Sequence, residues 1–184
     1  MIKKILASTV CFLTSAGIAC AAPYLGVSAS EKTNTSTNSN FRGMVGTVSL
    51  GYGSIINQNF YFGGELFADL GTGTITDNTS LVRPGVNSTS VKTTVGYGGS
   101  LLPGLMFSEH TMGFLRLSLL QDRFSSAHST VTGGQAGVGL QTNVTQCWDL
   151  RGEYDYTGFK TVPGNGTGTT RSDQFMLGLV YKFE

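Results

Sequence analysis

The chain has 184 residues, of which only 12% are charged, and its formal net charge at pH 7 is +1. A chain so close to neutral lacks the basic surplus with which proteins bind nucleic acids, so we exclude a nucleic-acid partner. Cys11, Cys20 and Cys147 show no Cys-x-x-Cys or zinc-binding spacing, which excludes a metal-stapled or thiol redox module.

The first 21 residues are typical of a cleaved secretory signal peptide. Two lysines precede an apolar core over residues 5–18, and a small-x-small cleavage site ends at Ala21. We predict cleavage after Ala21, because a cut one residue later would place Pro23 directly beyond the bond. A lipobox ending at Cys20 stays open as an alternative, although Gly17 stands where leucine is usual.

Removal of this segment leaves one exported domain over residues 22–184. It has ten Lys and Arg against eleven Asp and Glu, and Cys147 as its single cysteine, so it forms no internal disulfide. No apolar run in it reaches the 18 residues of a transmembrane helix, and apolar residues do not recur at helical spacing. The apolar pattern has period two, which predicts an all-β domain.

Eight strands are predicted in chain order, over residues 24–31, 42–53, 60–70, 91–107, 112–124, 133–144, 148–160 and 172–184. Long polar segments (32–40, 71–90, 125–132 and 161–171) alternate with short connections (54–59, 108–111 and 145–147). This alternation is typical of an up-and-down antiparallel meander with its long loops at one end. Because proline cannot donate to a ladder, Pro103 predicts a bulge or a frayed end in the fourth strand.

Each predicted strand has one apolar face and one mixed or polar face, because successive side chains point to opposite sides. In residues 148–160, for example, Trp148 and Leu150 alternate with Asp149 and Arg151. Aromatic residues on the apolar faces form one set near the short turns (Tyr52, Phe60, Phe62, Phe107, Trp148, Tyr181, Phe183) and a thinner set near the long loops (Tyr97, Tyr156, Phe175). Two such belts are typical of the two membrane–water interfaces.

The chain ends on a strand whose apolar face carries Phe175, Leu177, Leu179, Tyr181 and Phe183. With the eight-strand meander, this strand resembles the closing strand of bacterial outer-membrane barrels of the OmpA-like and opacity-protein type, although Glu184 follows the last aromatic residue. Residues 96–107 followed by 112–120 are similar to the central hairpin of that family. The resemblance covers the whole exported chain and implies an all-β, eight-stranded antiparallel up-and-down transmembrane β-barrel.

The resemblance also implies a location and partners. The protein is then expected to pass through the periplasm into the outer membrane of a Gram-negative bacterium, and to be a monomer in contact with outer-membrane lipids and lipopolysaccharide. Barrel assembly machinery would recognise the C-terminal strand, and the long loops would face outward, where a host-surface ligand is a candidate partner. A soluble lipocalin-like barrel, with its apolar face inside, stays open as the competing fold.

If the apolar faces meet lipid, the charged side chains between them point into a narrow lumen. Glu65, Arg116, Arg151 and Glu153 stand at similar heights above the short-turn ends of their strands, so we expect them to meet. Because buried charge is costly unless it is paired, these four residues predict a lumen charge network. In the resembled family such networks often block a continuous water path. We prefer a network that fixes the shape of the barrel; a gate or small pore stays open.

Enzymatic chemistry has little support in the sequence. His110 lies in a short connection, and His128 lies beside Ser126 and Ser129, but no acid stands at a spacing that indicates a catalytic triad. We therefore predict no enzyme, no catalytic residue, no cofactor and no metal site. The expected role is structural and surface-exposed, with adhesion as its specific form. A small channel is the second hypothesis and a lipid-modifying outer-membrane enzyme the third.

Overall fold

A computed structural model describes residues 22–36, 39–56, 59–70, 93–124, 129–159 and 171–183. Its strands are β1 (Ala22–Ser36), β2 (Ser39–Ile56), β3 (Phe60–Leu70), β4 (Thr93–Met106), β5 (Thr111–Phe124), β6 (Ser129–Asn143), β7 (Trp148–Phe159) and β8 (Arg171–Lys182). The predicted signal peptide, and with it the alternative lipid attachment at Cys20, lies outside the described residues. In the described ranges, no helix is long and apolar enough to cross a membrane.

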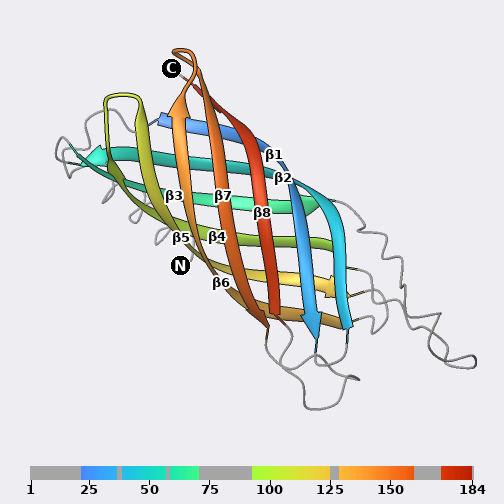
Figure 1. Ribbon diagram of the computed structural model, residues 1–184. Coiled ribbons are helices and arrows are strands. Elements are labelled where there is room, and N and C mark those ends of the chain that lie inside the picture. The colour runs from blue at the N-terminus through green and yellow to red at the C-terminus, as the bar shows by residue number, and fades with distance from the viewer. Residues whose placement is uncertain are drawn as a thin grey trace, which may run out of the picture.

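The eight strands form one closed barrel in chain order, in which β8 returns to pair with β1 (Figure 1). Every pairing is antiparallel; Val27 of β1, for example, lies opposite Val48 on β2 and Leu179 on β8. Closure pairs both edges of every strand, which is the condition for a sheet surrounded by lipid. The predicted all-β, eight-stranded up-and-down barrel is confirmed.

The two ends of the barrel differ. We call one the turn end, because β4 and β5 are joined there by residues 107–110, and β6 and β7 by residues 144–147. Ala22 and Lys182, the first and last strand residues, also lie there, since the strand number is even. We call the opposite end, at which β3, β5 and β7 finish, the loop end.

The apolar face of each strand points out of the barrel, as predicted. On β3, Leu66 is 67% exposed while its neighbours Glu65 and Phe67 are buried, and on β5 Leu119 is 73% exposed. A water-soluble protein would hide such residues, but here they form an apolar band around the molecule, as lipid requires. The lipocalin-like alternative, which needs the apolar face inside, is wrong.

Aromatic side chains border this band at both ends, as predicted. At the loop-end side, the Tyr97 hydroxyl donates to Gln121 Oε1 at 2.8 Å, and the Tyr154 hydroxyl donates to Asp173 Oδ1 at 2.7 Å. At the turn end, the exposed Trp148 ring stacks edge-on against the half-buried Tyr181 ring, with 5.0 Å between their centroids. Rings with an apolar body and a polar edge suit the membrane–water interface.

Most of the first long polar segment, residues 32–40, is strand and not the loop that the sequence predicted. β1 runs to Ser36, β2 begins at Ser39, and Thr33 lies opposite both Arg42 on β2 and Asp173 on β8. The apolar alternation stops here because strands of 15 and 18 residues reach past the hydrocarbon layer, where backbone pairing continues without lipid contact. β6 likewise begins inside the predicted loop 125–132.

Pro103 causes no bulge, which is a second correction. Leu101 lies opposite Leu117 and Gly104 lies opposite Phe114, so β4 keeps one register with β5 on both sides of the proline. The strand also does not fray there, since it continues to its end at the turn. The register shift between β4 and β5 lies instead at the loop end of β4.

The lumen contains two apolar clusters with a polar layer between them. The turn-end cluster consists of Tyr61, Leu102, Met112 and Phe114, and the loop-end cluster of Phe67, Leu120, Val131 and Phe159. The Phe114 ring occupies the space that a Cβ at Gly139 would need, and the Tyr61 ring does the same at Gly53. Large rings packed against glycine fill the narrow interior that eight strands enclose.

Candidate functional site in the barrel lumen

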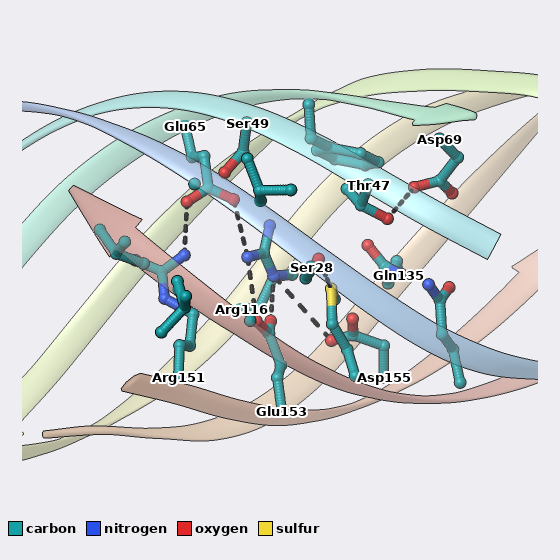
Figure 2. Close-up of a pocket in the computed structure, with 18 residues that line it drawn as sticks. Ser28, Thr47, Ser49, Glu65, Asp69, Arg116, Gln135, Arg151, Glu153 and Asp155 are labelled. Atoms are coloured by element: carbon teal, nitrogen blue, oxygen red, sulfur yellow. Dashed lines mark hydrogen bonds and ion pairs between the residues drawn. The ribbon is translucent and has the colours of Figure 1, made fainter. Parts of the chain in front are cut away.

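The predicted lumen residues come from three strands: Glu65 from β3, Arg116 from β5, and Arg151 and Glu153 from β7. Each lies opposite a glycine in the register: Glu65 opposite Gly51, Arg116 opposite Gly137, Glu153 opposite Gly139 and Arg151 opposite Gly178. At Gly51 and Gly139 the space that a Cβ would need is filled by the rings of Tyr24 and Phe114, which pack against the guanidinium of Arg151. All four side chains are buried and converge in the lumen (Figure 2).

Arg116 lies at the centre of the network. Its Nη2 donates to Glu65 Oε1 at 2.8 Å and to Glu153 Oε2 at 3.1 Å, and its Nε donates to Glu153 Oε1. Its Nη1 donates to Ser100 Oγ at 2.8 Å, and the guanidinium lies 5.8 Å from the centre of the Phe67 ring. One arginine thus joins two acidic residues on different strands, as charge-assisted forks do.

Arg151 extends the network toward the turn end. Its Nη1 donates to Glu65 Oε2 at 2.6 Å and its Nε to Gln141 Oε1 at 2.8 Å. The guanidinium lies 5.3 Å from the centre of the Tyr24 ring and 5.2 Å from that of Phe114, within cation–π range. The Tyr24 hydroxyl also donates to Glu65 Oε2, at 3.0 Å. Glu65 therefore accepts from both arginines, and the structure brings all four predicted residues into one network.

Two further charge pairs, one buried and one partly exposed, were missed by reasoning from the sequence. Near the loop end, Lys32 Nζ donates to Asp122 Oδ2 at 2.8 Å, although the sequence placed Lys32 in a solvated loop. At the turn end, Asp149 accepts from Gln141 at 2.6 Å and pairs with Lys182 at 2.9 Å. Lys32 and Asp122 are far apart in the chain, so only the strand register reveals their contact. The inward residues of β1 have even numbers, and so has Lys32. Extending the period-two pattern of β1 past residue 31 would have predicted that Lys32 points into the lumen.

The contacts among the described lumen residues are ion pairs and hydrogen bonds. No group of three His, Cys, Asp or Glu residues in the described ranges is placed to hold a metal ion. His110 is exposed in the turn between β4 and β5, on the outside of the network. His128 and Ser126 lie outside the described residues.

A closed barrel with an apolar exterior, aromatic borders and a charged interior defines a class of protein: the outer-membrane β-barrel. The family described as outer membrane protein beta-barrel domain matches residues 5–183, and the chain belongs to it. The protein is therefore located in the outer membrane.

Solved structures support the fold. Neisserial surface protein A is 23% identical, with a TM-score of 0.62, and the match covers 88% of this chain and 97% of that one. Ail, the attachment invasion locus protein of Yersinia pestis, is 16% identical with a TM-score of 0.54 over 89% of this chain and 99% of that one. A second structure shows Ail in complex with the heparin analogue sucrose octasulfate, at 16% identity and a TM-score of 0.51 over the same shares. A comparison with curated proteins gives no match.

Proposed function

We propose that this protein is a non-enzymatic, surface-exposed barrel that binds polyanionic glycans of a host surface through its loop end. The lumen network then holds the barrel rigid beneath the binding surface and conducts nothing. One observation carries the second half of this proposal: Arg116 and Arg151 are both held by buried partners between two apolar clusters. Displacing such paired charges to open a water path is costly.

Charge at the loop end supports the proposed partner. Outside the buried lumen residues, the strand ends there and the sequence that connects them carry more basic than acidic residues. The basic ones are Arg42, Arg83, Lys92, Arg123, Lys160 and Arg171; the acidic ones are Glu31, Asp77 and Asp173. On β2, β5 and β8, the arginines of this set have exposed side chains. A basic surplus on the outward end attracts sulfated or phosphorylated polymers, and Ail, with the same fold, is known in complex with a heparin analogue.

Binding to an immobilised sulfated glycan tests this role. The full chain, folded in lipid nanodiscs, is passed over heparin and over uncharged dextran as the reference surface. We expect salt-sensitive retention on heparin, reduced at least about tenfold when Arg42, Arg123 and Arg171 are all changed to Gln. The variant Lys182→Gln removes a basic side chain at the opposite end and should bind as the native chain does. Equal binding to heparin and dextran, or equal loss in both variants, would contradict the role.

Planar bilayers test the closed lumen separately. We expect the purified barrel to give no stable conductance steps above the bare membrane. Steady steps that vanish when a lumen residue is enlarged would instead support the small channel. Lipid A recovered from cells that overproduce the protein is expected to be unchanged, whereas a deacylated product would support the lipid-modifying enzyme.

A further inference from the structure

Asp155 on β7 is a buried acid that the charge network leaves without a hydrogen bond. It is 0% exposed, and neither carboxylate oxygen accepts from any described residue. Arg116 Nε lies 4.0 Å from Asp155 Oδ1, but its single hydrogen is already donated to Glu153. Arg116 therefore attracts Asp155 from a distance and leaves both of its oxygens available to another group.

The side-chain oxygen of Gln135 on β6 is in the same state. Gln135 is 8% exposed, and its Oε1 accepts no hydrogen bond from the described part of the chain. Asp155 and Gln135 line the same lumen cavity, which Thr47 and Asp69 also border (Figure 2). The centre of a water molecule can occupy a volume of about 20 Å³ in this cavity, which is room for one small guest.

Charge around this cavity is unbalanced. Lys32 and Asp122 neutralise each other nearer the loop end. In the layer below, the described cations are Arg116 and Arg151, and the described buried carboxylates are Glu65, Asp69, Glu153 and Asp155. The two arginines bind Glu65 and Glu153 directly, so with all four acids ionised the surplus negative charge lies on the two aspartates that border the cavity. Asp69 Oδ1 accepts a hydrogen bond from the hydroxyl of Thr47, at 2.7 Å.

Two kinds of guest could offset this surplus. A proton would satisfy one oxygen of one carboxylate. A cation is attracted by both aspartates and can be held by several oxygens together, including the amide oxygen of Gln135. Carboxylate and amide oxygens are the ligands that small hard cations prefer, and an uncompensated buried carboxylate is costly.

We propose that this cavity binds a small hard cation, held by the carboxylate of Asp155 and Oε1 of Gln135. The carboxylate of Asp69, which also lines the cavity, attracts the cation. Because fewer than three acidic ligands converge there, neutral oxygens that also line the cavity, such as the hydroxyl of Thr47, complete the coordination shell. The site is thus an exchangeable ion site that stabilises the folded barrel. It is independent of glycan binding at the loop end.

Thermal unfolding in different salts tests the site. The full chain is refolded into lipid vesicles in sodium, calcium or choline chloride at equal ionic strength, and Tm is recorded against salt concentration. A ligand that binds the folded state alone raises Tm as its concentration rises. We expect Tm in sodium or calcium to exceed that in choline by a few degrees. The difference should vanish in Asp155→Asn and persist in Asp149→Asn, which removes a buried acid of the same strand away from the cavity.

A second variant protects the test if Asp155→Asn does not fold. Gln135→Leu removes one ligand oxygen and leaves the acids in place, so the salt-specific difference should shrink in it. Equal Tm values in all three salts would overturn the proposal, as would an undiminished difference in both variants. An infrared band of a protonated carboxylic acid that Asp155→Asn abolishes would also overturn it, by assigning a proton to the site.

Discussion

Arg116 donates hydrogen bonds to Glu65, Glu153 and Ser100, all of them buried. Replacing it with Met leaves the buried carboxylate of Glu153 without its ion-pair partner and leaves Glu65 with Arg151 alone, which is far costlier than losing an exposed ion pair. We expect Arg116→Met to lower the free energy of unfolding by about 3–5 kcal/mol, measured by urea titration in lipid vesicles.

The exposed pair of Arg42 and Glu31 supplies the matched control. These side chains lie 3.7 Å apart and are largely exposed, so the substitution Arg42→Met should cost about 1 kcal/mol or less. If Arg42→Met proved as costly as Arg116→Met, the buried network would not be the source of the difference.

Lys32 tests the contact that the sequence did not reveal. Asp122 is 1% exposed, and Lys32 is its ion-pair partner at 2.8 Å. We expect Lys32→Met to destabilise the barrel by roughly 3 kcal/mol or more, again by urea titration, because it strands a buried carboxylate. The added substitution Asp122→Asn should recover part of this loss. A double variant less stable than Lys32→Met would argue that Asp122 has another cation partner.

Within the strands, some inward positions admit only glycine, because a neighbouring side chain fills the space that a Cβ would need. On β6, the Phe114 ring fills the space beside the inward Gly139. On β7, Gly152 lies on the outward face between the buried Arg151 and Glu153, and a Cβ there would meet nothing within 4 Å. We expect Gly139→Val to destabilise the protein by about 1–3 kcal/mol through overpacking. Gly152→Val, also inside a strand, should cost less than about 1 kcal/mol or be neutral. Similar effects of both substitutions in the urea titration would contradict the packing of the turn-end cluster.

Strands β1 and β2 extend past the apolar band, and amide hydrogen exchange can detect this. Residues 31–35 pair with β2 on one side and with β8 on the other, so we expect their hydrogen-bonded amides to exchange slowly. A solvated loop, as the polar sequence suggested, would exchange rapidly over the whole segment. NMR measurement in detergent micelles distinguishes the two.

The strand count and the direction of each face could be read from the sequence, because lipid on one side imposes a strict period of two. The meeting of Glu65, Arg116, Arg151 and Glu153 could also be predicted, since their heights above the turns are similar. The pairing of Lys32 with Asp122 could not. Above the membrane the outward positions become polar, and the period-two signal then disappears although the strand continues.

Other contacts inside the lumen also depend on how the strands pair and could not be predicted. Arg116 Nε donates its hydrogen to Glu153 and not to Asp155, which lies 4.0 Å away. Which of the two acids accepts this hydrogen bond depends on side-chain geometry that the sequence does not specify. The two apolar clusters combine residues from as many as four strands, and they become recognisable only once the barrel is closed.

For the molecule as a whole, the central physical claim is that one side of every strand meets lipid and the other fills the lumen. Leu117 and Ser118 are neighbours on β5 that test it, because the leucine is 53% exposed and the serine 6%. Their backbones lie at almost the same depth in the bilayer, so a difference in lipid exposure between the two side chains shows which of them points outward.

The most direct measurement places a nitroxide on a cysteine at either position, in a Cys147→Ser background, and compares its collisions with oxygen, which concentrates in the bilayer interior. We expect the label at position 117 to be strongly relaxed by oxygen and the label at 118 to be shielded, with Leu179 on β8 behaving like 117. Strong relaxation at 118 and shielding at 117 would show that the barrel is inside out.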